Sequence, residues 1–270
     1  MTTVTKNDIL KTLTELGIKN GDLVHFHSSL KSMGHVEGGP DAVIDAFLEA
    51  VGPEGTVAVP TLSQKNFERA YEDWTLDRPS DVGLITETFR LRKEAKRSDQ
   101  ATHSVAAIGR LAEYITADHG RSGLRKGIFG DTPFAVSSPW QKYHELNAKL
   151  VFVGVTMRYN TFKHYIEYRV AEDKLGAVKD KAAYDELSAH LRVYGNGGVG
   201  IWPFYDSLKL QGALEEAGLA KKAPCGDTEY ICANAADVYD FARDIFEREP
   251  ENWFGAEALE WIKQCEAASK

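Results

Sequence analysis

Short apolar runs alternate along the chain with longer segments in which apolar residues recur at helical spacing. The short runs are rich in β-branched and aromatic residues, as buried strands are, and span residues 22–27, 56–60, 103–109, 150–153 and 228–233. The longer segments predict helices at 6–16, 40–50, 82–96, 112–118, 138–146, 161–170, 184–194, 208–219, 236–249 and 254–268. This alternation predicts an α/β fold, a layered domain whose central, largely parallel or mixed sheet is flanked by helices.

One β-loop-α-β unit, residues 22–60, sets the expected direction of the sheet. Pro40 suits the first turn of its helix, and Gly52 and Gly55 turn the chain into the next strand. Such a connection places its two strands in parallel through a right-handed crossover. The segment 63–79, with Trp74 among its aromatic residues, is predicted to be a loop or flap.

The composition is that of an ordinary globular chain of 270 residues, with 43% hydrophobic and 27% charged residues. A net charge of −8 argues against a nucleic-acid partner. No apolar run approaches the ~18 residues that a membrane span needs, and the start of the chain does not read as a secretory signal. Cys225, Cys232 and Cys265 lack CxxC spacing and are expected to be reduced thiols, so we predict a cytoplasmic protein without membrane contacts.

The stretch 154–168 is the strongest candidate for chemistry. It follows the apolar run 150–153 and leads into a helix, for which Asn160 or Thr161 is the candidate N-cap. His164 and Glu167 stand three residues apart, so on a helix they share a face and can hydrogen-bond. α/β proteins commonly keep their site at the carboxyl end of a strand, although a bare His-x-x-Glu pattern also fits a structural pair.

Other motifs give weaker signals. The segment 195–200 has the letters G-x-G-x-x-G but lacks the strand before it and the helix after it that a dinucleotide loop requires. His25 and His27 face the same way on a strand and could both bind a metal ion. No third ligand stands at a suitable spacing in the sequence, so we expect no metal. No G-x-S-x-G elbow is present, which disfavours covalent catalysis.

The end of the strand at 22–27 is a candidate anion cradle. Small residues after a strand expose backbone N–H groups, so His27, Ser28, Ser29 and Leu30 suit a pyrophosphate. Further donors could come from the segments Arg97-Ser98 and His103-Ser104.

Taken in order, these pieces resemble the aminoglycoside 3-N-acetyltransferase family. The likeness rests on VHFHSSLKSMG, GGPDAVIDAFLEAVGPEGTVAVPT, RSDQATHSVAAIG, SSPWQKY and VFVGVTMRYNTFKHYIEY, which cover most of residues 21–168. The resemblance implies an antibiotic N-acetyltransferase fold, distinct from the common GNAT fold, and acetyl transfer from acetyl-coenzyme A to an amine. It also implies one domain over 1–270, with the cofactor and catalytic core in 1–170 and the remainder of the core and acceptor pocket in 171–270.

By position, the resemblance assigns His164 as the catalytic base and Glu167 as its carboxylate. It places the cofactor at His27, Ser28, Ser29, Leu30, Arg97, Ser98, His103, Ser104 and Val105. We expect the acceptor near Asn160, Arg158 and Trp74. The chain departs from the family pattern at Arg158, where an Asp is usual, and at Gln100-Ala101, where His-Pro is usual.

Arg158 in place of an acid weakens the case for a polycationic drug as the acceptor, so the acceptor could be an anionic or neutral amine instead. In the expected reaction His164 deprotonates the amine, Glu167 orients the imidazole, and the oxyanion is bound by a backbone N–H of residues 28–30 or by the Ser104 hydroxyl.

Two alternative functions remain open. One is a catalytically idle relative that binds coenzyme A or a partner protein, and the other is a metal-dependent hydrolase using His25, His27, His164 and Glu167. The expected state is a monomer or homodimer.

Overall fold

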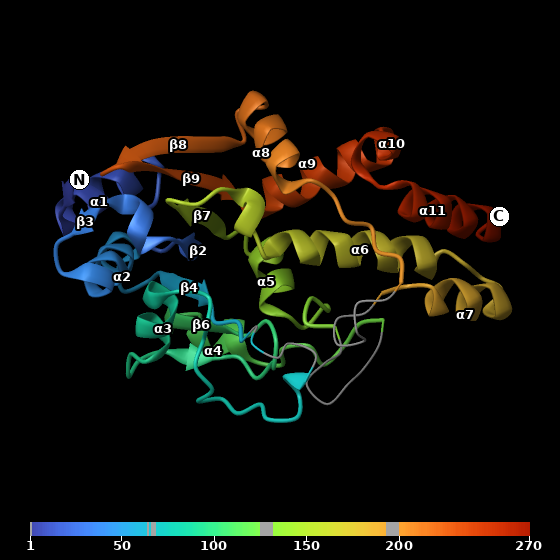
Figure 1. Ribbon diagram of the computed structural model, residues 1–270, viewed down its shortest axis with the longest axis horizontal. Helices are drawn as coiled ribbons and strands as arrows, with labels where there is room; N and C mark the ends of the chain where they lie inside the picture. Colours follow the sequence, from blue (N-terminus) through green and yellow to red (C-terminus); the bar gives the residue numbers. More distant parts are fainter. Residues whose placement is uncertain (1, 64, 66–68, 125–131, 193–199) are drawn as a thin grey trace.

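The computed structural model describes residues 2–63, 65, 69–124, 132–192 and 200–270 (Figure 1). Within these residues seven strands form one sheet, in the spatial order β5 (Lys96–Arg97), β6 (Val105–Gly109), β4 (Thr56–Pro60), β2 (Leu23–Ser28), β7 (Lys149–Val153), β9 (Thr228–Asn234) and β8 (Ala220–Cys225). The central strands β4, β2 and β7 are parallel, and the outer strands are antiparallel to their neighbours. A separate parallel pair joins β1 (Thr3–Val4) to β3 (His35–Val36). The mixed α/β sheet is confirmed, as is the parallel pairing of β2 with β4.

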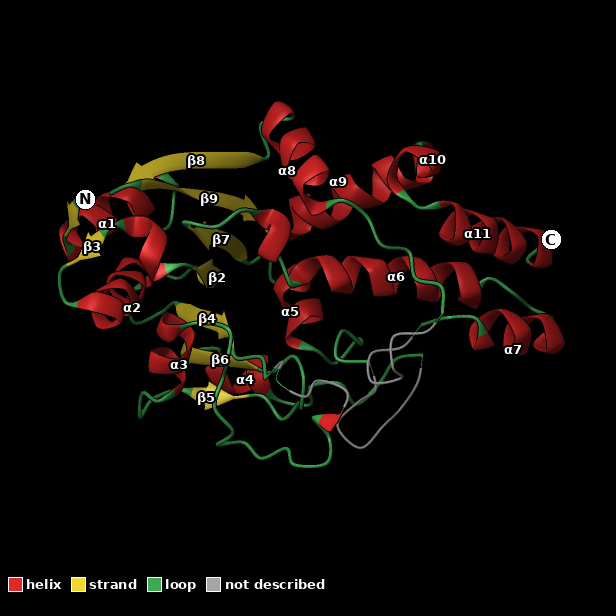
Figure 2. Cartoon of the chain, in the orientation of Figure 1, coloured by secondary structure: helices red, strands yellow, loops and turns green. Residues whose placement is uncertain are grey.

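The sheet is buried on both faces because its strands alternate two sets of side chains. In β2, Leu23 belongs to a first hydrophobic core on one face of the sheet, whereas Val24 and Phe26 belong to a second core on the other face. The second core is closed by α1 (Lys6–Glu15), α2 (Gly39–Val51) and α3 (Leu84–Arg90). The first is closed by α4 (Ala112–Thr116), α5 (Pro139–Glu145), α6 (Phe162–Gly176) and α9 (Ala235–Arg248). Figure 2 shows the sheet between these two helical layers.

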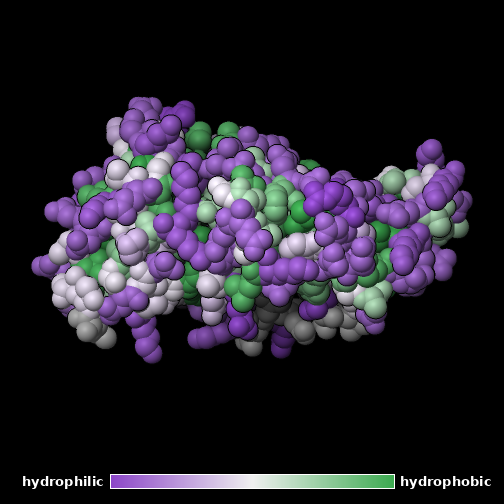
Figure 3. All heavy atoms as spheres, turned by 90° about the horizontal axis from the view of Figure 1, so that it is seen from above, coloured by the Kyte–Doolittle hydropathy of each residue, from purple (hydrophilic) through white to green (hydrophobic). Residues whose placement is uncertain are grey.

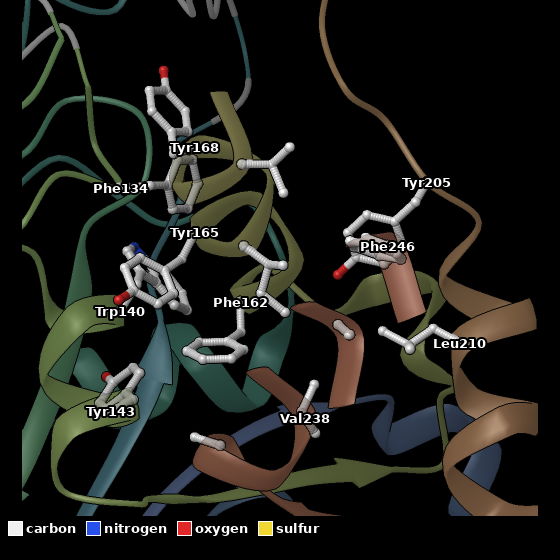
Figure 4. Packing of buried hydrophobic residues seen from close by; sticks show 14 of the residues in the cluster. Phe134, Trp140, Tyr143, Phe162, Tyr165, Tyr168, Tyr205, Leu210, Val238 and Phe246 are labelled. Atoms are coloured by element: carbon white, nitrogen blue, oxygen red, sulfur yellow. The ribbon is translucent and has the colours of Figure 1, made fainter. Parts of the chain in front are cut away.

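The first core extends beyond the sheet into the C-terminal half of the chain. It includes residues of α7 (Lys181–Ala189), α8 (Ser207–Glu216) and α11 (Ala256–Ala268), while α10 (Pro250–Trp253) connects α9 to α11. Helix α6 runs through the middle of this core. In Figure 4, Phe134, Trp140 and Tyr143 lie on one side of it and Tyr205, Leu210 and Phe246 lie on the other. This long helix therefore shares a core with both halves of the chain.

The sequence pattern missed or misjudged several elements. The predicted helix 82–96 is wrong in extent, since α3 ends at Arg90 and Lys96 already belongs to β5. Strand β8 was not predicted, because its sequence AKKAPC is polar and contains proline. Lysine and proline are typical of an edge strand, which is where β8 lies. The helix predicted at 184–194 begins earlier and ends at Ala189.

The surface is mostly hydrophilic on the face shown in Figure 3, with small hydrophobic areas between the charged ones. Among the described residues, no helix is long and apolar enough to cross a membrane. Cys225, Cys232 and Cys265 are all buried and unpaired.

Candidate functional site

The candidate site lies at the carboxyl edge of β4, β2 and β7, where α/β sheets commonly bind ligands. Strand β6 runs antiparallel to β4 and pairs Val105 with Pro60, so its first residues reach the same edge. An open cleft of about 930 Å³ lies there. The residues that line it come from the ends of β2 and β4, from the segments after β2, β4 and β7, from the residues before β6 and from the starts of α3 and α6. They include His27, Ser28, Ser29, Asp81, His103, Arg158, Asn160 and His164.

His164 and Glu167 form a hydrogen-bonded pair in the first two turns of α6. The His164 Nδ1 atom lies 2.7 Å from Glu167 Oε2. The histidine side chain is 23% exposed and borders the cleft, whereas the glutamate is 0% exposed behind it. The predicted contact is therefore confirmed, and it links a cleft-facing imidazole to a buried carboxylate.

The carboxylate fixes the tautomer of the neutral imidazole. An ionised carboxylate only accepts hydrogen bonds, so the Nδ1 atom of His164 must carry the proton. In the neutral ring the Nε2 atom is then the basic nitrogen. This is the arrangement that a carboxylate-oriented general base requires.

Two further side chains hold Glu167 in place, and sequence reasoning identified neither. The Trp202 indole donates to Oε2 at 3.2 Å, and the Lys163 ammonium lies 3.4 Å from Oε1. Lys163 also donates to the Tyr205 carbonyl at 2.7 Å. A buried carboxylate stays charged only where such partners compensate it. The Lys163–Glu167 spacing of four was a usable signal, but nothing local ties Trp202 to α6.

The bend after β2, residues 29–32, forms another wall of the site. Ser32 donates to the carbonyls of Ser29 and Gly154, both at 2.8 Å, so this bend is tied to the end of β7. Gly154 has φ +64°, and a Cβ there would meet the Ser32 hydroxyl at 2.1 Å. Glycine is therefore required where these two segments meet.

A second groove of about 630 Å³ adjoins the cleft and shares Ser28, Ser29, Val82 and Gly83 with it. Its walls are residues 28–31 and 34–36 on one side and 82–85 on the other. The hydroxyls of Ser28 and Ser29 and the Lys31 ammonium have no hydrogen-bond or ion-pair partner among the described residues. The groove therefore combines polar donors with apolar walls.

His27 makes structural hydrogen-bond contacts inside the fold. Its Nε2 atom accepts from the Thr161 backbone N–H at 3.3 Å and contacts the Thr161 hydroxyl at 3.0 Å. Burial lowers the pKa of His27 to about 3. The ring is therefore neutral, and it ties the start of α6 to the end of β2.

His25 lies in the core, packed against the rings of Trp140 and Tyr143. Burial, and His27 nearby, lower its pKa well below the usual value. In the described part of the chain, no group of three or more His, Cys, Asp or Glu side chains is placed to hold a metal ion. The described residues therefore bring together no ligand set for the metal-dependent hydrolase.

Of the cofactor residues predicted between Arg97 and Val105, only His103 is among the described residues that line the cleft. Its ring centre lies 6.2 Å from that of His164. Arg97 donates to the carbonyls of Leu76 and Thr61, both at 2.8 Å. Burial lowers the pKa of Arg97 to about 10.

The hydroxyls of Ser98 and Ser104 are buried and engaged, since Ser98 accepts from the Val105 N–H and Ser104 donates to the Thr61 carbonyl. The described lining of the cleft does not include Arg97, Ser98, Ser104 or Val105, and their contact with a cofactor stays a prediction. Leu30 lines the adjoining groove.

Of the predicted acceptor residues, Arg158 and Asn160 line the cleft. Trp74 does not. It is buried against Ala70 and Ala101 and donates to Asp99 at 2.8 Å. The glycine-rich segment at 195–199 lies outside the described residues.

Comparison with known proteins identifies the family. The family described as Aminoglycoside 3-N-acetyltransferase matches residues 25–247. The YokD aminoglycoside N(3')-acetyltransferase-like protein of Bacillus subtilis is 31% identical over 93% of this chain and 92% of its own length. Its crystal structure has a TM-score of 0.70 at 21% identity, covering 93% of this chain and 96% of that one.

Two other relatives give narrower matches. Aminoglycoside N(3)-acetyltransferase VII of Streptomyces paromomycinus is 28% identical over 61% of this chain, and the match spans 60% of that protein. The structure described as AAC-IIIb with CoASH has a TM-score of 0.68 at 20% identity, covering 94% of this chain and 98% of its own. By its match over more than half its length, the chain belongs to the aminoglycoside 3-N-acetyltransferase family.

Proposed function

We propose that this protein is an acetyl-coenzyme A-dependent N-acetyltransferase that moves an acetyl group to an amine of an aminoglycoside or a related amino compound. The observation that carries the proposal is the His164–Glu167 pair, whose imidazole borders the cleft while its carboxylate is buried. The names of the relatives support it, as does the neighbouring structure that holds CoASH.

The groove beside the cleft fits the cosubstrate. Coenzyme A carries phosphates on a long, partly apolar arm, so it needs anion donors along an extended channel. Ser28, Ser29 and Lys31 supply donors, and Leu30, Val82 and Leu84 supply apolar wall. The groove and the cleft share Ser28 and Ser29, which supports a binding mode in which the thioester end of the arm enters the cleft that His164 lines.

His164 Nε2 takes a proton from the acceptor nitrogen as that nitrogen bonds to the acetyl carbonyl carbon. The carbon–sulfur bond then breaks, and the proton held by His164 returns to the departing sulfur. Glu167 stabilises the imidazolium that exists between these two transfers. No acyl-enzyme forms, and acetyl-coenzyme A supplies the activated acetyl group.

Hydrogen bonds within the protein reduce the number of candidate donors to the oxyanion. The Ser104 hydroxyl donates to Thr61, and the Ser29 N–H donates to Val153 at 2.9 Å. The Leu30 N–H has no acceptor among the described residues. It is therefore the favoured donor within the bend after β2.

Acetyl-coenzyme A is a cytoplasmic cosubstrate, and three buried, unpaired cysteines fit a reducing compartment. Both support the expectation that the protein works in the cytoplasm. The expectation of a monomer or homodimer stays a prediction.

The proposal is tested by release of coenzyme A thiol from acetyl-coenzyme A with a panel of amines, with mass detection of the acetylated product. The panel contains kanamycin, gentamicin, simple amino sugars and amino acids. Thiol release that depends on one of these amines and yields its acetyl adduct supports the transferase. Binding of acetyl-coenzyme A without release in the presence of any amine supports the idle relative instead.

A further inference from the structure

An unpaired arginine stands on the cleft wall that follows β7. Arg158 lies in the short 3-10 helix η3 (Met157–Tyr159), six residues before His164, and lines the same cleft. Its side chain is exposed, and its guanidinium has no hydrogen-bond, ion-pair or ring partner among the described residues. A guanidinium presents a planar set of donors that matches carboxylate and phosphate oxygens.

A second donor lines the same cleft. Asn160 is only 3% exposed, and its side-chain oxygen accepts from the Phe162 N–H at 3.0 Å. The amide NH2 group is therefore what Asn160 can offer a ligand, and no described residue accepts from it. Two neighbouring side chains thus present donors to the cleft.

Carboxylates are scarce around these donors. Among the described residues that line the cleft, Asp81 is the only acid, and it belongs to the segment 81–86 that follows β4 rather than to the one that follows β7. It already accepts from the Lys65 N–H at 2.7 Å. Lys163 adds a second cation to the lining, but its ammonium is held by Glu167 and the Tyr205 carbonyl. The described lining of the cleft therefore favours an anion over a cation.

We propose that Arg158, assisted by Asn160, selects an acceptor amine that also carries a carboxylate or phosphate group. This inference rests on the proposed acetyl transfer and narrows its substrate class. The anionic group pairs with Arg158, which brings the amine of the same molecule to His164. A polycationic acceptor meets the uncompensated guanidinium instead and binds less well.

An anion at Arg158 could also belong to the cosubstrate. The described lining of the adjoining groove contains residues 28–31, 34–36 and 82–85, and Arg158 is not among them. Arg158 follows β7, whereas these segments follow β2 and β4. The geometry therefore points to the acceptor, and separate KM values for acceptor and acetyl-coenzyme A distinguish the two sources.

The experiment uses acceptors matched in pairs that differ in one anionic group: D-glucosamine 6-phosphate with D-glucosamine, and glycine with glycinamide. Kanamycin serves as the polycationic comparison. Thiol release is measured for the wild type and for Arg158→Ala, Arg158→Lys and Arg158→Glu. We expect kcat/KM to be at least ~10-fold higher for the acidic member of at least one pair, and Arg158→Ala to raise its KM by about 10- to 100-fold.

Arg158→Lys should recover part of this loss, and Arg158→Glu should shift the preference toward kanamycin. The KM for acetyl-coenzyme A should stay within about twofold. The matched control is Arg110→Glu, which makes the same charge change at an exposed arginine just after β6, at the opposite edge of the sheet.

Equal kcat/KM within both pairs overturns the inference, as does a rise in the KM for acetyl-coenzyme A alone in Arg158→Ala. No thiol release with any amine contradicts the proposed function instead. In that case, calorimetric titration of the coenzyme A-saturated protein decides the inference. Tighter binding of glucosamine 6-phosphate than of glucosamine, lost in Arg158→Ala, supports it, and equal binding of the two sugars overturns it.

Discussion

Glu167→Gln isolates the charge behind the catalytic imidazole. Glutamine has the same shape as glutamate and keeps an oxygen that can accept from both His164 Nδ1 and the Trp202 indole. Lys163 still has the Tyr205 carbonyl. What is lost is the negative charge 2.7 Å from the nitrogen of a ring that becomes positive during the reaction.

The size of the effect follows from that contact. A hydrogen bond to a charged group contributes about 1.5–3 kcal/mol, and about 1.4 kcal/mol corresponds to a factor of ten in rate. The bond gains its full charge-assisted strength only once the imidazolium forms, so its loss acts on the transition state. We therefore expect kcat to fall by about 10- to 150-fold with little change in the KM for acetyl-coenzyme A.

The assay is initial-rate thiol release at saturating acetyl-coenzyme A with the best acceptor found. Trp202→Phe provides a graded comparison, since it removes one neutral donor to the same carboxylate and should cost about 2- to 10-fold. Glu186→Gln, an exposed position on α7, is the matched control and should be silent. A Glu167→Gln enzyme within twofold of wild type would refute the orienting role of this carboxylate.

Further outcomes follow from the same geometry. Lys31→Ala should weaken acetyl-coenzyme A binding by about 3- to 10-fold, and the difference from wild type should shrink in high salt; equal dissociation constants measured by calorimetry would contradict the groove assignment. Acid should destabilise the fold, because burial lowers the pKa of His27 and of His119 to about 3. Between pH ~6.5 and ~3 the unfolded chain binds one more proton at each of these rings, so the free energy of unfolding should fall by about 1.4 kcal/mol per pH unit for each as the pH drops. Urea denaturation from pH 7.5 to 5 checks this, with His119→Gln expected to flatten the slope, and a flat profile in the wild type would oppose it.

The sequence predicted those parts of the fold that depend on local pattern. The unit from β2 through α2 to β4 follows from short apolar runs and a well-placed proline, and the His164–Glu167 contact follows from helical spacing alone. Strand β8 was missed because an edge strand has little need of an apolar pattern.

The other residues of the site depend on distant pairings. Trp202 donates to Glu167 from 35 positions away in the sequence. The residues around Trp202 show no sequence pattern that would predict this contact. Arg97 and Trp74 look like ligand-binding residues by type. Their cation–π contact, at 4.7 Å, instead joins the loop around Trp74 to β5. Residue type indicated chemistry there, but only the three-dimensional structure shows which side chains border the cleft.

The central claim is that the His164 imidazole is the base that deprotonates the acceptor. The most direct test measures, on one preparation of His164→Ala, both the dissociation constant for acetyl-coenzyme A and the rate of amine-dependent thiol release, with exposed His190→Ala as control. The account predicts an unchanged dissociation constant and a rate lower by about 10²- to 10⁴-fold. Turnover equal to that of the wild type would contradict it.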